Sequence, residues 1–328
     1  MRYFVTGATG FIGGRIARQL LASGHEIIVL VRDLPKASQL ANSGAILHKG
    51  DVGDKESMRE GMKGVDGIFH TAGWYKVGTR DKHLGEEVNV KGTRNVLELM
   101  RELQIPRGVY TSTLAVFSDT KGKLVDEGYR HGGPWLSEYD RTKWVAHYEI
   151  ALPMIAQGLP LIIVQPGLTY GPGDTSQFRE FLVRYVGGKL KSIPRKAAYC
   201  WAHVDDRARG HLLAMERGRV GESYIIAGEP HTVAEAFKIA ENVSGIPAPR
   251  REISPRILRL LASVSWLFER VIPMPETYTS ESLRVLAGVT YLGSNEKAKR
   301  ELGFTCRPLE DGLRETLAHE RQLLTESS

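Results

Sequence analysis

The sequence predicts an α/β fold in which a doubly wound parallel sheet is joined by a smaller, mostly helical lobe. Three observations support this fold class. Short apolar runs alternate with longer helical patterns through the first half of the 328 residues. A glycine-rich segment links the first apolar run to the first helical pattern. In the run EIIVLV, the five residues after Glu26 are apolar without interruption, as in a strand that is covered by helices on both faces.

The strands of the sheet are expected where short apolar runs end in small or polar residues. YFVTG comes first, and EIIVLV, AILHKGD, VDGIFHTAG, RGVYTST and LIIVQPG follow the same pattern. The expected strands therefore span residues 3–7, 26–31, 45–51, 65–73, 107–113 and 161–167.

Helices are expected between these strands. Ile12, Ile16 and Leu20 recur every four residues within 11–23, and Gly24 is a natural end for this first helix. Pro153 is expected to kink the last helix of this part of the chain. The other expected helices span residues 54–62, 84–103 and 137–157.

The alternating pattern loosens after Pro166. From about residue 232 the chain is expected to be mostly helical, with Pro and Gly breaks. Its apolar stretch 257–272 predicts an amphipathic helix, either a lid over a hydrophobic substrate or a part of the core. The expected elements before residue 232 are a helix at 176–187, a strand running into a helix at 199–218, and a strand at 223–229.

Composition excludes several classes of function. The net charge is +6 and the pI is about 9.2, but acidic and basic residues alternate along the chain, which does not favour a nucleic-acid-binding surface. Cys200 and Cys306 have no metal-ligand spacing, so no metal site is expected. A strand-like run starts at Tyr3, so we expect no signal peptide. Charges interrupt the stretch 257–272, which argues against a membrane span. A cytoplasmic protein is expected.

The segment TGATGFIGG predicts a dinucleotide-binding turn. Glycines at 7, 10 and 13 follow a strand and open a helix, so that backbone amides approach a phosphate at the positive end of the helix dipole. The alternative is a plain strand–helix turn. We predict cofactor contacts from Gly7, Thr9, Gly10, Phe11 and Ile12.

The residues after the second strand bear on which dinucleotide binds. Val31 ends the strand where an acidic residue would hold an adenosine ribose, and Arg32 and Lys36 follow. An arginine suits a 2′-phosphate because its guanidinium is a rigid bidentate fork. This favours NADP, but NAD stays possible, since Asp33 is placed where it can turn toward the ribose. Further cofactor contacts are predicted for Asp51, Val52, Thr71, Ala72 and Pro166.

These motifs together resemble a known family. TGATGFIGG, GDV, HTAG, NVKGTRNV, YTSTLAVFS and YDRTK stand in the order seen in the extended short-chain dehydrogenases/reductases. VRD after the second strand is similar to the branch of dihydroflavonol-reductase-like and hydroxysteroid-dehydrogenase-like enzymes. The later PGLTYGPGD, HVDD and LGF…PLEDGL also fit, so the resemblance covers most of the chain. It implies a Rossmann-type domain and an NAD(P)-dependent oxidoreductase.

The resemblance implies a catalytic set of Thr113, Tyr139 and Lys143. Tyr139 is the general acid–base, Thr113 orients the substrate oxygen, and Lys143 also holds the nicotinamide ribose. Ser112 is the alternative to Thr113, and only one of two neighbours on a strand can face the cleft. We expect the ammonium of Lys143 and the oxidised nicotinamide ring to lower the pKa of Tyr139 from its usual value of about 10. Tyr139 and Lys143 are also predicted to touch the cofactor.

Other polar and aromatic residues near these motifs are expected to be structural or to line a substrate pocket. Asn89 is expected to be structural, as is His70, and His203, Asp205 and Asp206 are expected to pack and cap a helix. Trp74, Tyr75 and Trp201 are candidates for either a substrate pocket or the core, and position favours the pocket for the first two. The residues at 140–142, between Tyr139 and Lys143, are expected to be ordinary helix residues.

The domain division follows from the cofactor motifs. Residues 1–165, with 199–228 returning to them, are expected to form the cofactor-binding domain. Residues 166–198 and 229–328 are expected to form the substrate-binding lobe. The resemblance further implies a homodimer through the helices expected at 84–103 and 137–157.

Two rival functions remain open at this point. One is a nucleotide-sugar epimerase or dehydratase with tightly bound NAD(P), although the chain has a short segment between YGPG and HVD and lacks the Arg-Asp pair often seen before HVD. The other is a non-catalytic NADP-binding sensor, although the Tyr and Lys of the catalytic set are both present. The main prediction is an NADP-preferring enzyme that transfers hydride between the cofactor and a carbonyl or secondary alcohol of a small substrate. The apolar stretch 257–272 suggests that this substrate is hydrophobic, but the sequence does not name it.

Overall fold

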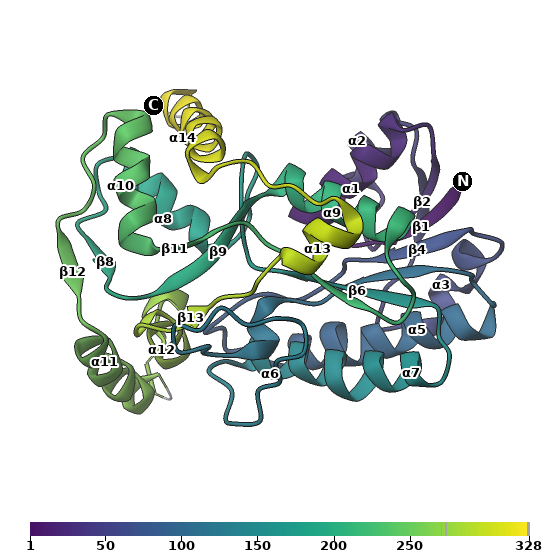
Figure 1. Ribbon diagram of the computed structural model, residues 1–328, viewed down its shortest axis with the longest axis horizontal. Helices are drawn as coiled ribbons and strands as arrows, with labels where there is room; N and C mark the ends of the chain where they lie inside the picture. The colour runs from purple at the N-terminus through teal and green to yellow at the C-terminus, as the bar shows by residue number, and fades with distance from the viewer. Residues whose placement is uncertain (270, 273, 327–328) are drawn as a thin grey trace.

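The computed structural model describes residues 1–269, 271–272 and 274–326 (Figure 1). The strands are β1 (Arg2–Thr6), β2 (Glu26–Val31), β3 (Ile46–Lys49), β4 (Gly67–His70), β5 (Gly108–Thr111), β6 (Leu161–Pro166), β7 (Leu168–Tyr170), β8 (Ser192–Pro194), β9 (Ala198–His203), β10 (Ser223–Ile226), β11 (Pro230–Thr232), β12 (Arg251–Ile253) and β13 (Thr290–Tyr291).

The α-helices are α1 (Phe11–Ala22), α2 (Ser38–Asn42), α3 (Lys55–Met62), α4 (His83–Gly85), α5 (Thr93–Glu102), α6 (Glu138–Val145), α7 (Leu152–Ala156), α8 (Gln177–Val186), α9 (Val204–Arg217), α10 (Val233–Ser244), α11 (Pro255–Phe268), α12 (Ser280–Leu286), α13 (Glu296–Leu302) and α14 (Leu309–Glu326). Short 3-10 helices are η1 (Pro35–Ala37), η3 (Leu114–Phe117) and η5 (Glu276–Tyr278), and π-helical turns are η2 (Glu86–Gly92) and η4 (Ala146–Ala151).

A seven-stranded sheet carries the first half of the chain. Its order is β10-β6-β5-β4-β1-β2-β3, and every pairing is parallel. Helices α1 and α9 cover one face, and α3, α5 and α7 cover the other (Figure 1). Neighbouring residues of β1 alternate between these layers, because Val5 packs with the first and Phe4 with the second. The predicted doubly wound sheet is confirmed.

The sheet reverses its strand order at β1. The chain adds β2 and β3 on one side of β1, and β4, β5, β6 and β10 on the other. A crevice opens at such a switch point, beyond the carboxyl ends of the strands. The topology therefore places Gly7, which directly follows β1, at the natural ligand site.

The smaller lobe combines helices with short strands. A second sheet joins β11, β9 and β13, with β7 alongside β9, and its core lies between that sheet and α8, α10 and α14. A parallel pair, β8 with β12, and the packed helices α11 and α12 complete it. β9 thus lies in this second sheet, whereas α9 and β10 pack with the first.

The two long helices of the first half differ from the expectation. Each contains a π-helical turn, η2 near the start of the segment 84–103 and η4 in the middle of the segment 137–157. Pro153 has no N–H to offer to an upstream carbonyl, and η4 changes the hydrogen-bond pattern just before it. β5 also ends at Thr111, two residues before the expected end of that strand.

The apolar stretch near the C-terminal end forms a helix, as expected. α11 packs on α12 through Leu258 and Ala262, but most of its large apolar side chains are exposed. The suggestion that this segment is simply core is therefore wrong. Within the described residues, no helix is long and apolar enough to cross a lipid bilayer.

Candidate active site

The glycine turn after β1 has the backbone geometry that a phosphate cradle needs. Gly7 has a φ of +74°, and a Cβ at this position would lie 2.6 Å from the backbone nitrogen of Ala72. A Cβ on Gly13 would lie 2.2 Å from the carbonyl oxygen of Gly7. α1 starts at Phe11 with no side-chain cap, so its first amides are directed to the crevice without an internal acceptor. The turn therefore fits a dinucleotide pyrophosphate at the start of α1.

One cavity of about 630 Å³ runs along the carboxyl ends of the strands. Its wall brings together residues that follow β1, β2, β3, β4, β5 and β6. The predicted site residues that line it are Gly7, Thr9, Gly10, Phe11, Ile12, Arg32, Asp51, Val52, Thr71, Ala72, Thr113, Tyr139, Lys143 and Pro166. The predicted set therefore borders a single continuous cavity.

The end of this cavity beyond β2 and β3 carries Arg32 and Asp51. The Arg32 side chain is 76% exposed, and its Nε lies 3.8 Å from a carboxylate oxygen of Asp51. Asp33 is not part of the cavity wall; its carboxylate pairs with Lys36 at 3.5 Å. The guanidinium thus borders the cavity, and the competing carboxylate of Asp33 is engaged outside it.

Ser112 and Thr113 both border the cavity but have different partners. They lie beyond the end of β5, so the alternation of a strand does not apply to them. The Ser112 hydroxyl is 2.8 Å from Nδ1 of His147, a buried neutral ring. The Thr113 hydroxyl interacts with the Tyr139 phenol, where it counteracts the rise in the pKa of that phenol, and it also accepts from the amide of Ala115. The structure therefore brings Thr113, and not Ser112, to the phenol.

Tyr139 and Lys143 lie on α6 within the cavity wall, as their spacing predicts. Burial raises the pKa of Tyr139 to about 12, opposite to the expected lowering. Burial also lowers the pKa of Lys143 to about 7, so its amine carries only part of a charge near neutral pH. Its Nζ donates to the Thr111 carbonyl at 2.7 Å and to the Tyr110 phenol at 3.2 Å. The hydroxyl of Tyr139 is therefore a proton donor in this environment.

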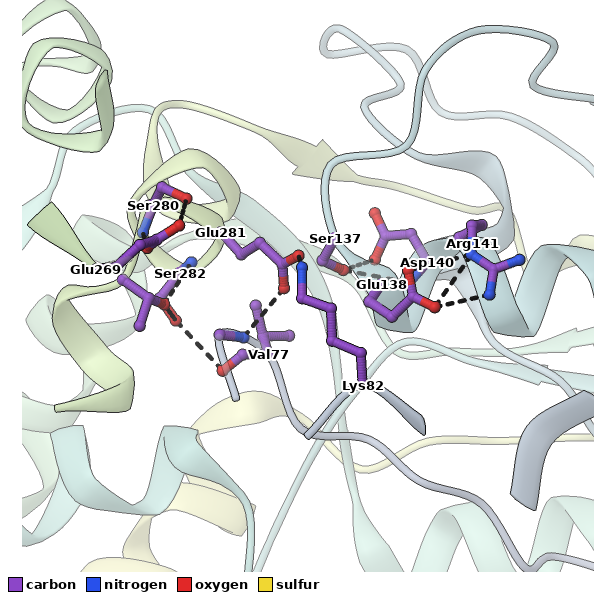
Figure 2. Close-up of polar contacts among 12 residues, drawn as sticks. Val77, Lys82, Ser137, Glu138, Asp140, Arg141, Glu269, Ser280, Glu281 and Ser282 are labelled. Carbon is purple, nitrogen blue, oxygen red and sulfur yellow. Dashed lines mark hydrogen bonds and ion pairs between the residues drawn. The ribbon is translucent and has the colours of Figure 1, made fainter. Parts of the chain in front are cut away.

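Asp140 is a site residue that sequence reasoning missed. It is buried and borders the cavity, and its carboxylate accepts from the hydroxyl of Ser137 at 2.8 Å (Figure 2). It also accepts from the hydroxyl of Tyr291 at 3.0 Å. Burial raises its pKa to about 7. Tyr291 in turn stacks on Tyr199, with ring centres 6.0 Å apart. The expectation that Asp140 is an ordinary helix residue is wrong, because it is buried and one of its partners, Tyr291, comes from β13.

The two residues after Asp140 lie on different faces of α6. Thr142 is buried and accepts from the side-chain amide of Asn89 at 2.9 Å. Arg141 is partly exposed and pairs with Glu138 (Figure 2). It also pairs with Glu86. Thr142 therefore also departs from the expectation, whereas Arg141 is an ordinary surface residue.

Asn89 holds the cavity wall rather than reaching into the cavity. Its side-chain oxygen accepts from the Trp74 amide, and its nitrogen donates to the Trp74 carbonyl, both at 2.8 Å. Trp74 and Tyr75 then border the cavity, as their position predicts. Trp201 packs in the core of the smaller lobe, 4.9 Å from the ring of Phe178.

The histidines of the predicted motifs are structural. His70 is fully buried, and its ring lies 2.8 Å from the Thr6 hydroxyl and 3.1 Å from the Thr93 hydroxyl; burial lowers its pKa to about 3. His203 caps α9 by accepting from the Asp205 amide. Asp206 forms a bidentate pair with Arg307. These contacts fit the expected packing and capping.

The segment after Trp74 closes the cavity against α12. The carboxylate of Glu281 accepts from the Gly78 amide and from Nζ of Lys82, and the Ser282 hydroxyl donates to the Val77 carbonyl (Figure 2). Val77 and Val285 border the cavity on the two sides of this contact. The smaller lobe thereby supplies one wall of the cavity.

Comparison with known proteins places the chain in a family. Residues 3–227 match the model of the NAD dependent epimerase/dehydratase family. The chain belongs to this family. It is thus an NAD(P)-dependent oxidoreductase of the extended short-chain dehydrogenase/reductase type, and the resemblance seen in the motifs is confirmed.

Curated relatives of this family member share about its full length. It is 30% identical over 313 residues to "Sterol demethylase protein B" of Methylococcus capsulatus, covering 93% of each chain. It is also 30% identical to a "Putative dihydroflavonol 4-reductase" of Synechocystis, covering 92% of the chain and 89% of the relative. A third relative, of Stigmatella aurantiaca, is named "4-hydroxy-2-methyl-3-oxo-4-farnesyl-3,4-dihydroquinoline-1-oxide ketoreductase" and is 30% identical, covering 94% and 92%.

A solved structure has the same fold along its whole length. The crystal structure of gox2253 superposes with a TM-score of 0.83 at 31% sequence identity, covering 98% of each chain. Both the parallel sheet and the smaller lobe are therefore shared with an experimentally determined structure.

Proposed function

We propose that the chain is an NADP-preferring oxidoreductase that reduces a carbonyl group, or oxidises the matching secondary alcohol, of a small hydrophobic substrate. The observation that carries this proposal is the contact between the hydroxyls of Thr113 and Tyr139, in the wall of the same cavity as the glycine turn and Lys143. An acid, an orienting hydroxyl and a cradle for the cofactor stand together there.

The cofactor preference rests on Arg32. Its guanidinium borders the adenosine end of the cavity, and Asp33 is held by Lys36 outside the cavity wall. A 2′-phosphate would gain a bidentate partner at this position. The same arrangement leaves no carboxylate from position 33 for the ribose hydroxyls of NAD.

Tyr139 acts as the general acid in this proposal. When bound, the nicotinamide cofactor supplies the hydride. The Tyr139 hydroxyl donates its proton to the substrate oxygen as negative charge develops there, and the Thr113 hydroxyl donates a hydrogen bond that orients this oxygen. In the reverse direction the Tyr139 oxygen accepts the proton. Lys143, held by Thr111 and Tyr110, is positioned to bind ribose hydroxyls. In its charged form, its ammonium group would also favour the phenolate form of Tyr139.

The substrate class follows from the part of the cavity wall that the smaller lobe and the segment after β4 supply. That wall is largely aromatic and aliphatic, and it includes Trp74, Tyr75, Phe178, Tyr199, Tyr291 and Val285. Such a wall gains by removing apolar surface from water. The names of two relatives refer to a sterol and to a farnesylated ring, which agrees with a hydrophobic substrate.

The domain division and the dimer remain proposals. Residues 1–165 with 199–228 would hold the cofactor, and 166–198 with 229–328 would hold the substrate. A homodimer would form through the outer sides of α5 and α6. Sedimentation of the purified protein over a range of concentrations tests the dimer.

A turnover assay tests the proposed reaction. Purified protein is supplied with NADPH or NADH and a panel of hydrophobic ketones, and loss of absorbance of the reduced cofactor is followed. We expect net consumption, faster with NADPH. Retained NAD(H) with no net consumption would instead identify the epimerase or dehydratase. NADPH binding without turnover, together with no functional effect of Tyr139→Phe, would identify the sensor.

A further inference from the structure

α11 presents a stripe of large apolar side chains to solvent. The residues of this α11 outer face are Ile257, Leu260, Leu261, Val264, Leu267 and Phe268. They recur every three or four residues and so share one side of the helix. Leu260 is 65% exposed and Leu267 is 61% exposed, and Val271 and Ile272 extend the stripe beyond the end of the helix. A contiguous apolar surface of this kind marks an interaction site.

The α11 outer face is exposed although α11 itself is held in place by the rest of the chain. The opposite side of α11 packs Leu258 and Ala262 against Leu283 and Ala287 of the α12 region. At the C-terminal end, Glu269 accepts from the amide and the hydroxyl of Ser280 (Figure 2). α11 therefore has two apolar sides, and the residues that the structure describes cover only one of them.

Exposed arginines lie on α11 and on the segments beside it, before its start and on α12. This arginine fringe consists of Arg250, Arg251, Arg256, Arg259 and Arg284, all of them exposed. Within the part of the chain that the structure describes, none of the five forms an ion pair. Arg259 and Arg284 share one surface hollow of about 450 Å³ with Trp266. The fringe is therefore free to meet anionic groups.

The acidic residues of the same region are already engaged. Each carboxylate between residues 251 and 284 has a partner: Glu252 has Arg195, Glu269 has Ser280, Glu276 has Lys76 and Glu281 has Lys82. The combination at this end of the molecule is thus an apolar stripe with unpaired positive charge beside it.

We propose that α11 binds the surface of an anionic lipid membrane, with the α11 outer face in the acyl boundary and the arginine fringe at the headgroups. An amphipathic helix with basic residues beside its apolar face lies in such an interface. Each arginine near an anionic leaflet adds to the attraction. A second copy of the chain is a poorer occupant if it binds through the same face, because that face would bring the same unpaired cations, and the carboxylates between residues 251 and 284 are already engaged.

The position of α11 connects the membrane surface with the cavity. α12 packs beside α11 and contributes Val285 to the cavity wall, and the Arg80 guanidinium on the segment after Trp74 donates to the carbonyls of Glu269 and Ile272. A substrate dissolved in lipid would meet the cavity wall close to the bound helix. This consequence rests on the proposed function, whereas lipid binding itself does not.

Co-sedimentation with vesicles tests the proposal. The purified full chain is mixed with vesicles of phosphatidylcholine alone, or of equal parts phosphatidylcholine and phosphatidylglycerol. We expect it to sediment with the anionic vesicles and to be released as salt is raised. Leu267→Ser with Phe268→Ser should weaken binding about 10-fold or more. The matched control, Leu124→Ser with Val220→Ser, removes exposed apolar side chains elsewhere and should bind as the unmodified chain does.

The arginine fringe is tested separately. Arg256→Gln with Arg259→Gln should weaken binding to anionic vesicles about 10- to 30-fold. Lys238→Gln with Arg321→Gln removes the same charge from α10 and α14 and should have little effect. Thermal unfolding of each variant establishes that the fold is kept, and NADPH binding without vesicles reports on the proposed function independently.

Three results would overturn the lipid proposal. The first is absence of sedimentation with anionic vesicles. The second is an equal loss of binding in the control variants. The third is self-association of the unmodified chain that Leu267→Ser with Phe268→Ser abolishes while vesicles are not bound, which would make a second copy the occupant.

Discussion

The phenol of Tyr291 donates a 3.0 Å hydrogen bond to the carboxylate of Asp140, although the two residues are 151 positions apart in the chain. Asp140 directly follows Tyr139, and both border the cavity. The bond ties the helix that carries Tyr139 to a strand of the smaller lobe. The Asp140 carboxyl group is buried and has no positively charged partner among the described residues. The titration of this carboxyl group should therefore be visible in the stability of the protein.

Asp140 should make stability fall as pH rises. Burial raises its pKa from 3.8 to about 7, so the folded state holds a proton that the unfolded state releases. The contribution is complete below pH 4 and is lost as pH rises through 7, by up to about 4 kcal/mol. We expect Asp140→Asn to remove this part of the pH dependence. Urea unfolding at several pH values measures it.

The matched control for this experiment is Asp311→Asn, an exposed carboxylate on α14. It should leave the slope of stability against pH between 4 and 8 unchanged. An unaltered slope in Asp140→Asn would show that the carboxyl group does not titrate in this range.

Removing the Tyr139 hydroxyl should abolish the proposed reaction without removing the cofactor. Tyr139→Phe deletes the proton donor and leaves the glycine turn intact, so turnover should fall by at least about 100-fold. Fluorescence titration with NADPH should give nearly the affinity of the unmodified chain. Tyr278→Phe, which changes an exposed phenol, serves as the control. Normal turnover in the Tyr139→Phe variant would refute the role.

Substitution of Ser112 should mainly lower stability, whereas substitution of Thr113 should mainly lower turnover. Thr113→Ala removes the hydroxyl that interacts with the Tyr139 phenol and should lower turnover about 10- to 1000-fold, with partial recovery in Thr113→Ser. Ser112→Ala leaves Nδ1 of the buried His147 without its partner and should cost about 1–3 kcal/mol of stability. Turnover and urea unfolding on the same variants decide it. The reverse pattern would assign the role to Ser112.

Arg32 should distinguish the two cofactors. Arg32→Ala removes the guanidinium at the adenosine end, so NADPH affinity should fall about 10- to 100-fold while NADH affinity changes little. Asp33→Asn should affect neither, because Lys36 holds that carboxylate away from the cavity wall. Titration of both cofactors against the three proteins gives the comparison. Tighter binding of NADH by the unmodified chain would contradict the proposed preference.

Local patterns were sufficient for the sheet and the cofactor end of the site. Strand runs, the glycine spacing and the helical spacing of Tyr139 and Lys143 depend on neighbours within a few residues, and the structure places all of these where they were expected. The ends of elements were less accurate. β5 stops at Thr111, and π-helical turns interrupt both long helices. Packing and Pro153 alter the backbone hydrogen bonds at these places, and residue propensities do not predict such changes.

The titration of the site was not predictable in the same way. Lys143 was expected to lower the pKa of Tyr139, but desolvation acts on both groups and raises the pKa of Tyr139 to about 12. Desolvation depends on how many atoms surround a group in three dimensions. Residue spacing along one helix carries no information about it.

The sequence by itself determined the doubly wound sheet, the glycine cradle after β1 and the pairing of Tyr139 with Lys143 on one helix, because each depends on contacts between near neighbours. Only the tertiary structure decided that Thr113 rather than Ser112 meets Tyr139, that Asp140 is buried against Tyr291, and which apolar side of α11 faces solvent. The physical reason is that burial and partner choice are set by segments far apart in the chain, which come together only when the smaller lobe packs on the sheet.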